Sequence, residues 1–325
     1  MARERIYPFA VASVRSMENK LLTKQKLMQM AEAKDAEEAL RMLADSDYGK
    51  TQVKDVHDFE VMIRANQEEA YQAVAKLIPN ETFMDIFRFK NDYHNVKVLI
   101  KEEISKVNGD PFLIQGGTIP VEELRKHFRE RNYIELPNID EKAVEEAIET
   151  YAKTKSGSYI DTILDRACFR VMSDAAKKLG IPYVEKYICK LADVTNLKML
   201  LRIKKLNRTE EELLACAVPG GEIGVDTLVR AYRSDSLLSV LKETGYSSLC
   251  TGYMEQGFTV FEKACDDYLM NYVKEAKYKT LTPEPVAAYI LAKETEAKCV
   301  RIIMTCKIRG IDSETIKERV REAYV

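Results

Sequence analysis

The 325-residue chain contains no tryptophan and has little of the two residues that most often end helices. It has 13 glycines and 9 prolines, together well below the usual share of about 12%. Because turns depend on these residues, a long chain with few of them favours long helices over many short strands. Residues that lose little side-chain entropy in a helix, such as Ala, Glu, Lys and Leu, are abundant. The composition therefore predicts an all-α protein.

Neither charge is in clear surplus, because the chain has 50 basic and 52 acidic residues and a net charge of −2. Binding nucleic acid through its phosphates needs a clear basic surplus, so we expect no nucleic-acid partner. One basic cluster, Arg202, Lys204, Lys205 and Arg208, has the spacing of a solvated helix face. No uninterrupted run of apolar residues reaches the ~18 that are needed to span a bilayer. The sequence does not start with the Met-Gly that would predict myristoylation. We therefore expect a soluble protein with no direct lipid anchor.

Side chains suited to catalysis or metal binding are few and scattered. The seven cysteines are odd in number and none has the C-x-x-C spacing, which predicts free thiols. His57, His94 and His127 form no metal-binding pattern. Residues 49–51 (Gly-Lys-Thr) resemble the end of a phosphate-binding loop, but Ala44 stands where the first glycine is needed and no strand precedes it. We expect no enzyme activity, no cofactor and no metal.

Apolar residues recur at helical spacing along most of the chain, and no period-two alternation persists long enough to predict a strand. Asp35 has the pattern of an N-cap, with Glu38 three residues later as in a capping box. Proline, glycine and asparagine mark the points where helices stop and start. The predicted helices run over 9–33, 55–78, 80–107, 119–131, 140–153, 159–179, 183–206, 225–243, 253–278, 284–309 and 313–323.

Two sequence patterns recur at a spacing of about one hundred residues, which is too long for a solenoid repeat. The first, Gly-Gly-x-Ile-x-Val-x-x-Leu, begins at Gly116 and again at Gly220, 104 residues later. Each copy is a glycine break that opens an amphipathic helix.

The second pattern occurs three times and places an acid, an asparagine and a base on one predicted helix. The acids follow one another at intervals of 101 and 103 residues, and an apolar run follows each base. In the third copy Cys299 replaces the asparagine. The members of this repeated motif are Asp92, Asn95 and Lys97, then Asp193, Asn196 and Lys198, then Glu296 and Arg301.

A looser third element places an apolar residue five positions before a tyrosine. It occurs at Leu43–Tyr48, Phe128–Tyr133 and Leu241–Tyr246. Together the three elements predict three similar helical domains from internal triplication. Their predicted bounds are 1–110, 111–215 and 216–325, and three like units imply either an approximate threefold pseudosymmetry or a staggered arrangement.

The repeated motif has two interpretations. The acid and the asparagine lie on one face of the helix, because residues three apart are neighbours on its surface. In the first interpretation these polar groups bridge to neighbouring segments and fix the packing of each domain, since buried polar groups need partners in any fold. In the second they form a ring of like residues that faces a binding partner.

The motif and its surroundings resemble the central-stalk C subunit of V/A-type ATPases and ATP synthases, whose eukaryotic counterpart is called d. The resemblance begins at Tyr7–Leu22 and extends over essentially the whole chain. It is also carried by Leu43–Tyr48, Asn91–Lys101, Ala192–Arg202 and Lys293–Arg301. Cys299 departs from the asparagine of the other copies, which puts the polar role of that position in doubt.

The resemblance implies a funnel-like, three-domain rotor subunit with no catalytic role. Its partners would be central-stalk subunits of the D and F type and the membrane proteolipid ring, and it would transmit torque for proton or sodium transport. It would lie at the cytoplasmic face of the membrane as a peripheral part of the complex. A generic helical scaffold or adaptor without a rotary partner is the alternative, and an enzyme with an undetected site is a third possibility.

Overall fold

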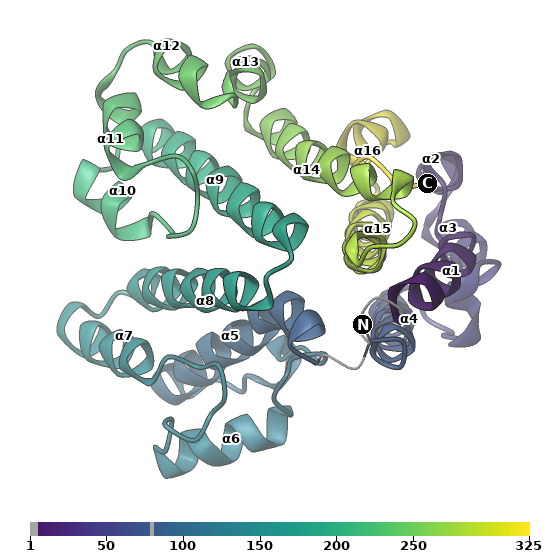
Figure 1. Ribbon diagram of the computed structural model, residues 1–325, viewed down its shortest axis with the longest axis horizontal. Coiled ribbons are helices and arrows are strands. Elements are labelled where there is room, and N and C mark those ends of the chain that lie inside the picture. Colours follow the sequence, from purple (N-terminus) through teal and green to yellow (C-terminus); the bar gives the residue numbers. More distant parts are fainter. Residues whose placement is uncertain (1–5, 79–80) are drawn as a thin grey trace. The chain divides into compact units, whose positions relative to one another are not determined.

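The computed structural model describes residues 6–78 and 81–325, and every regular element within these ranges is a helix (Figure 1). The helices fall into two compact units. Unit 1 combines the described residues before 79 with Gly245–Val325, and unit 2 is Glu81–Thr244. The predicted all-α class is confirmed. The division into 1–110, 111–215 and 216–325 is a different partition of the chain and stays a prediction.

Unit 1 is built around one long helix, α15 (Glu284–Ile308), which packs against helices from both ends of the chain. Most of its residues are buried, as expected of a helix that is apolar on nearly every side. Figure 1 shows α15 between α14 and α16 on one side and α1 and α4 on the other. The surrounding helices are α1 (Ile6–Glu18), α2 (Lys24–Glu32), α3 (Ala36–Ala44), α4 (Phe59–Ala75), α13 (Ser247–Gln256), α14 (Phe258–Lys274) and α16 (Ser313–Arg319).

The core of unit 1 mixes residues that are far apart in the sequence. Leu27, Met30 and Leu43 pack with Val300 and Ile303 in one buried cluster. The two ends of the chain also meet at the surface, where the Lys24 amide donates to the carbonyl of Val325. This unit therefore forms only when both ends of the chain come together.

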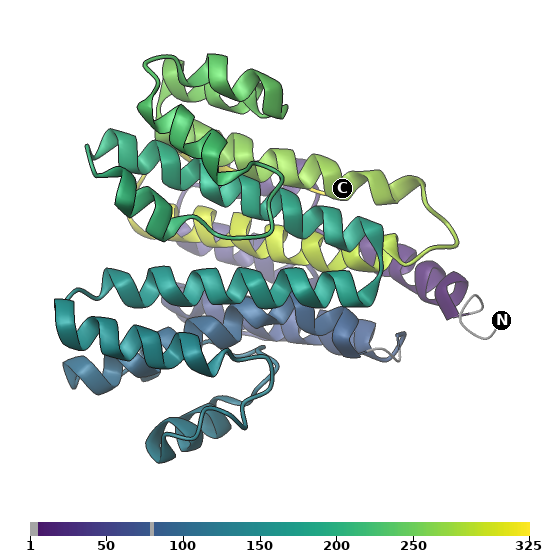
Figure 2. The same ribbon diagram turned by 60° about the vertical axis from the view of Figure 1, so that its left-hand side comes forward.

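Unit 2 consists of the middle of the chain. Its long helices α5, α8 and α9 run side by side (Figure 2), with α8 packed against both α5 and α9. Phe87 on α5 lies edge-on to Tyr187 on α9, with their ring centroids 6.5 Å apart. The helices are α5 (Glu81–Ser105), α6 (Val121–Glu130), α7 (Glu141–Thr154), α8 (Ser158–Leu179), α9 (Pro182–Lys205), α10 (Glu210–Cys216), α11 (Val225–Arg233) and α12 (Leu237–Leu241).

The helices α5, α9 and α15 carry the three copies of the repeated motif, and they end alike. A residue with positive φ follows each of them: Lys106, Asn207 and Gly310. Each stands 14 residues after the acid of its own copy. The second and third ends also share a hydrogen bond across the turn, from Arg208 N to Ile203 O and from Ile311 N to Cys306 O, both 3.0 Å. This is the Schellman pattern of a left-handed helix end.

The three predicted motif helices, 80–107, 183–206 and 284–309, are confirmed as α5, α9 and α15. Asp35 is the N-cap of α3, as predicted, and its side chain accepts the Glu38 amide.

Three other predicted helices are interrupted. The helix expected over 9–33 breaks between α1 and α2, where the side chain of Thr23 caps α2. The helix expected over 225–243 divides into α11 and α12, and 253–278 is cut at Gly257, whose φ is +88°.

Candidate functional site

The acids of the first two motif copies accept hydrogen bonds from a loop further along the chain, which lies before α6 for Asp92 and between α10 and α11 for Asp193. The Asp92 carboxylate accepts the amides of Thr118 and Ile119 at 3.0 and 3.1 Å, and also the Thr118 hydroxyl at 2.7 Å. Asp193 accepts the amides of Glu222 and Ile223 at 3.1 and 2.8 Å. Each buried acid thus fixes the backbone just before the next helix, α6 in one case and α11 in the other.

The close contact between each carboxylate and the loop backbone explains the paired glycines of the first pattern. A Cβ added at Gly117 would lie 2.1 Å from Asp92 Oδ1, and one at Gly221 would lie 2.2 Å from Asp193 Oδ1. The glycine before each of them has a positive φ, +85° at Gly116 and +96° at Gly220. The second glycine is therefore required for space and the first for backbone conformation.

The asparagines hold a second point of the same loops. Asn95 Nδ2 donates to Ile114 O at 2.8 Å, and its Oδ1 accepts the Ile114 amide at 2.9 Å. Asn196 makes the same pair with Val218, at 2.9 and 2.8 Å. An asparagine side chain has both a donor and an acceptor, so it can pair with the N–H and the C=O of one loop residue.

In the third copy the acid is surrounded by a different set of partners. Glu296 accepts the Leu22 amide and the Tyr48 hydroxyl, the latter at 2.9 Å, and pairs with Lys293 at 2.8 Å. The Lys293 ammonium also donates to Asn66 Oδ1 at 2.7 Å. The Lys293 and Glu296 side chains are 2% and 4% exposed, so this is a buried ion pair with hydrogen bonds on both sides.

The bases of the motif are less buried than the acids and pair with a neighbouring helix. Lys97 lies 2.8 Å from Asp165 on α8, and Arg301 contacts Glu60 on α4 at 2.6 Å. Lys198 is partly buried on α9 and also takes part in an interaction. The ion-pair partners of Lys97 and Arg301 therefore lie in the same unit as the base itself.

Burial shifts the pKa values of these groups. It raises the pKa of Asp92, although the hydrogen bonds from Thr118 and Ile119 counteract part of that effect. Burial next to the Glu296 carboxylate likewise holds the pKa of Tyr48 well above its usual value, so the phenol stays a hydrogen-bond donor. In Cys299, burial raises the thiol pKa to about 12, which makes it an unreactive side chain. Its sulfur lies 3.8 Å from Arg321 O.

Sequence reasoning missed the partners of Glu296. Tyr48 belongs to the looser tyrosine element, but nothing in the sequence connected it with a residue almost 250 positions away. Asn66 and Lys293 belong to neither of the two repeated patterns. The contact between these residues depends on how the ends of the chain pack, and a local pattern does not encode that.

The other candidate residues have structural partners. His94 Nε2 lies 2.9 Å from Phe112 O, and His127 Nδ1 lies 2.9 Å from Asn132 O. Lys50, in the segment that resembled a phosphate loop, pairs with Asp47 and Glu69. Its neighbour Gly49 sits against Ala44, whose carbonyl leaves no room for a Cβ.

Among the described residues, Cys189, Asp193 and Glu222 are close enough to share a metal ion, with ligand atoms within 4.8 Å of one another. Asp193 already accepts two backbone amides, and Glu222 pairs with Lys186. Burial raises the pKa of the Cys189 thiol, and the two nearby carboxylates raise it further. Loop anchoring explains this arrangement without an ion.

Comparison with known proteins decides the family. The family described as ATP synthase (C/AC39) subunit matches residues 10–319 of this chain. The chain belongs to this family. Over 318 residues it is 26% identical to the C subunit of the V-type sodium ATPase of Enterococcus hirae, covering 96% of this chain and 97% of that protein.

Archaeal members of the family are similarly related. The C subunit of the A-type ATP synthase of a Desulfurococcus species is 25% identical, with 97% of this chain and 91% of that protein covered. The corresponding protein of Thermococcus kodakarensis is 26% identical, with 97% and 90% covered. This chain is therefore a non-catalytic subunit of a V/A-type ATPase complex. No helix in the described ranges has the length and apolar character needed to cross a bilayer.

Proposed function

We propose that this chain is the rotor subunit that links the central stalk of a V/A-type ATPase to its membrane proteolipid ring. It would act as a socket for stalk subunits of the D and F type and pass torque to the ring, so that ATP chemistry is coupled to proton or sodium transport. The observation that carries the proposal is the family match over residues 10–319, together with relatives that are named as the C subunits of such complexes.

We also propose that the chain arose by internal triplication of one helical unit and that its three copies form a funnel with approximate threefold pseudosymmetry. Several observations support the triplication. The acids of copies one and two hold a Gly-Gly loop in the same way, and their asparagines hold another loop residue in the same way. After all three motif helices, a residue with positive φ stands 14 residues beyond the acid.

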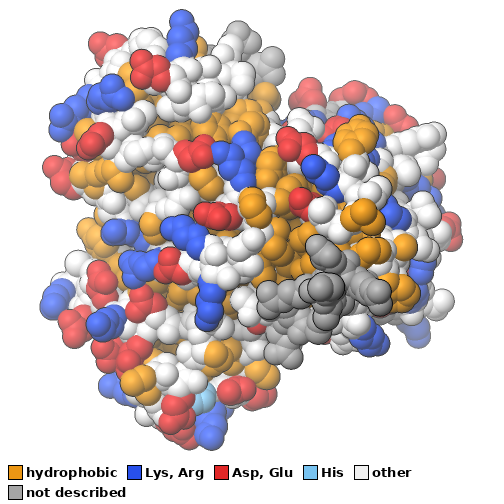
Figure 3. Space-filling model, viewed as in Figure 1, with side chains coloured by type: hydrophobic (Ala, Val, Ile, Leu, Met, Phe, Trp, Pro, Cys, Tyr) orange, Lys and Arg blue, Asp and Glu red, His pale blue; other side chains and the backbone are white. Residues whose placement is uncertain are grey.

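The physical character of the chain suits a part that transmits force. Its motif helices span 24 or 25 residues and pack along buried stripes, so each resists bending better than a loop-rich structure. On the described part of the face in Figure 3, basic and acidic side chains are interspersed. A mixed surface suits partly polar protein interfaces, in keeping with protein partners rather than nucleic acid.

Co-purification from native membranes tests the proposal. The tagged chain should be isolated from detergent-solubilised membranes with proteolipid, stalk and catalytic subunits in fixed ratios. A chain that comes away alone, or with unrelated proteins, would support the alternative of a generic helical scaffold.

A second experiment tests whether the chain is attached peripherally to the cytoplasmic face of the membrane. The chain should stay on inverted vesicles that contain the proteolipid ring and leave vesicles from which the ring has been removed. Retention on ring-free vesicles would contradict attachment through the ring.

A further inference from the structure

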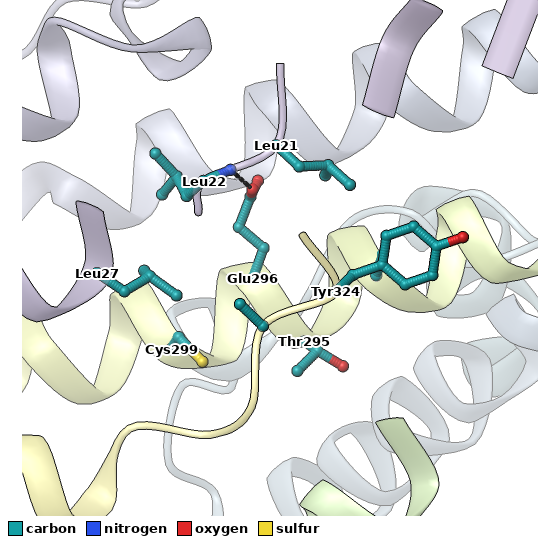
Figure 4. A pocket seen from close by; sticks show the side chains of 9 residues that line it. Leu21, Leu22, Leu27, Thr295, Glu296, Cys299 and Tyr324 are labelled. Carbon is teal, nitrogen blue, oxygen red and sulfur yellow. Dashed lines mark hydrogen bonds between the residues drawn. The ribbon is translucent and has the colours of Figure 1, made fainter. Parts of the chain in front are cut away.

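The third motif copy differs from the first two in where its acid finds a partner. Asp92 and Asp193 hold amides that lie 26 to 30 residues further along the chain. Glu296 instead holds the amide of Leu22, which precedes it by 274 residues. In Figure 4 the Glu296 carboxylate points from α15 towards this amide, beside a small pocket lined by residues from both ends of the chain.

Leu22 occupies the same local position as the loop residues of the other copies. Ile119, Ile223 and Leu22 each stand two residues before the start of a helix: α6, α11 and α2. All three side chains are buried, at 3%, 6% and 5% exposure. All three amides donate to the acid of a motif helix.

We propose that the third copy is split between the two ends of the chain, with the N-terminal segment up to α4 supplying its second half. In this arrangement α15 opens the copy, α16 and α2 follow, and α4 closes it. The proposal rests on the triplication proposed above but not on the rotary role.

The bases support the same division independently. Lys97 on α5 pairs with Asp165 on α8, the helix that comes just before the next motif helix, α9. Arg301 on α15 pairs with Glu60 on α4, the helix that comes just before α5. In each case the base contacts the helix that closes its own copy, and for the third copy that helix lies near the start of the sequence.

The change from aspartate to glutamate fits the altered loop. In the first two copies a glycine four residues before the helix start lets the acid come close, at Gly117 and Gly221. Lys20 stands at that position before α2 and carries a Cβ. A longer side chain reaches the Leu22 amide from further away. The Tyr48 hydroxyl and the Lys293 ammonium donate the other hydrogen bonds that Glu296 accepts.

The contact set around Glu296 therefore closes unit 1. Tyr48, Asn66 and the Leu22 amide come from the N-terminal segment, and Lys293 and Glu296 come from α15. Both members of the buried ion pair lie on α15, and the N-terminal segment supplies its other hydrogen bonds. Leaving these buried groups without partners would be costly, so the segment and the helix stabilise each other.

Hydrogen exchange of the isolated full chain, read by mass spectrometry, tests this closure. Tyr48→Phe removes one hydrogen bond to Glu296 and little volume. We expect exchange to rise about tenfold both in peptides from 20–32 and in peptides from α15, while peptides from 81–244 stay within about twofold. The control is Tyr133→Phe, the same change in the tyrosine element of unit 2, which should leave α15 unchanged.

Glu296→Gln extends the test. If the variant folds, the same two segments should exchange faster still, and the effect of combining it with Tyr48→Phe should be smaller than the product of the single effects. If it does not fold, the Tyr48→Phe result decides alone. An increase confined to peptides around residue 48, or independent effects of the two changes, would overturn the split copy. Neither result bears on the rotary role, which the membrane experiments test separately.

Discussion

At the scale of single residues, the buried acids explain most of the unusual features of the sequence. A carboxylate that is almost fully buried must be given hydrogen bonds, because an unpaired buried charge is too costly. Asp92 and Asp193 receive theirs from backbone amides, and this is possible only where glycine lets the backbone come close. The Gly-Gly pattern and the acid of the motif are thus two parts of one contact, although they stand about 25 residues apart in the sequence.

This contact makes Gly221 far more sensitive than a glycine of the same unit with open space around it. Gly221→Ala should push the Asp193 carboxylate away from its two amides and lower the free energy of unfolding by roughly 2–4 kcal/mol. Gly157→Ala, where no atom lies within 4 Å of the added Cβ, should change it by less than about 1 kcal/mol. Urea denaturation followed by helix circular dichroism measures both. Equal effects of the two changes would mean that the loop contact contributes little.

At the scale of helices, the sequence predicts the long elements well and their interruptions poorly. The three motif helices are correct to within one or two residues at each end because their apolar residues and end signals agree. The break after α1 was missed, since Leu21 and Leu22 continue the helical spacing of apolar residues. What ends the helix there is the capping of α2 by Thr23 and the contact of Leu22 with Glu296. Gly257 was a visible signal for the break before α14, but the apolar pattern on both sides obscured it.

The candidate site, like the helices, was predictable from the sequence only in part. The spacing of the motif predicted the acids, the asparagines and the bases as one group, and their role in packing stays a proposal that the contacts of Asp92, Asp193 and Glu296 support. The partners of Asp92 and Asp193 could have been found from the paired glycines, which recur at nearly the same spacing. Those of Glu296 could not, because a one-time contact between distant residues leaves no repeat in the sequence.

The junction between the chain ends should respond to acid through Glu322. Burial raises the pKa of this carboxyl, but hydrogen bonds and charge from Lys24 and Lys274 outweigh it and hold the pKa below its usual value. The pKa of an unfolded glutamate is about 4.3. An acid whose pKa is lowered in the fold stabilises it above that unfolded pKa and loses this effect as the pH falls through the folded pKa.

We therefore expect Glu322→Gln to lower the free energy of unfolding at about pH 6.5 and to have little effect near about pH 3. Urea denaturation at both values measures the difference. The matched control is Glu149→Gln, since Glu149 pairs with Lys153 only through exposed side chains within α7. A Glu322→Gln effect that is equal at both pH values would show that the ion pairs are not its cause.

At the scale of the whole molecule, we propose that the chain acts as a mechanical part of the complex. The family to which it belongs forms a non-catalytic subunit of the ATPase complex. Lys50, in the segment that most resembled a nucleotide loop, is already paired with two acids. The unit that joins both ends of the chain has its own polar cluster, which would keep it closed while neighbouring subunits exert force on it.

The isolated chain should accordingly bind no ATP at micromolar concentration. A phosphate loop needs a row of free backbone amides and a free lysine. The amides of Gly49 and Thr51 already donate to backbone carbonyls, and Lys50 is paired with two acids. Isothermal titration calorimetry with protein free of other subunits measures this, with the catalytic subunits as the positive control. Saturable micromolar binding to the chain alone would contradict a purely mechanical role.

Reconstitution with and without this chain tests the rotor role most directly. Vesicles that contain the proteolipid ring are combined with the catalytic head and stalk, and ATP hydrolysis, attachment of the head and ATP-driven ion uptake are measured together. Without the chain, the head should hydrolyse ATP but neither stay attached nor drive uptake, and adding the chain should restore both. If attachment and ion uptake are the same in its absence, the chain is not the link between stalk and ring.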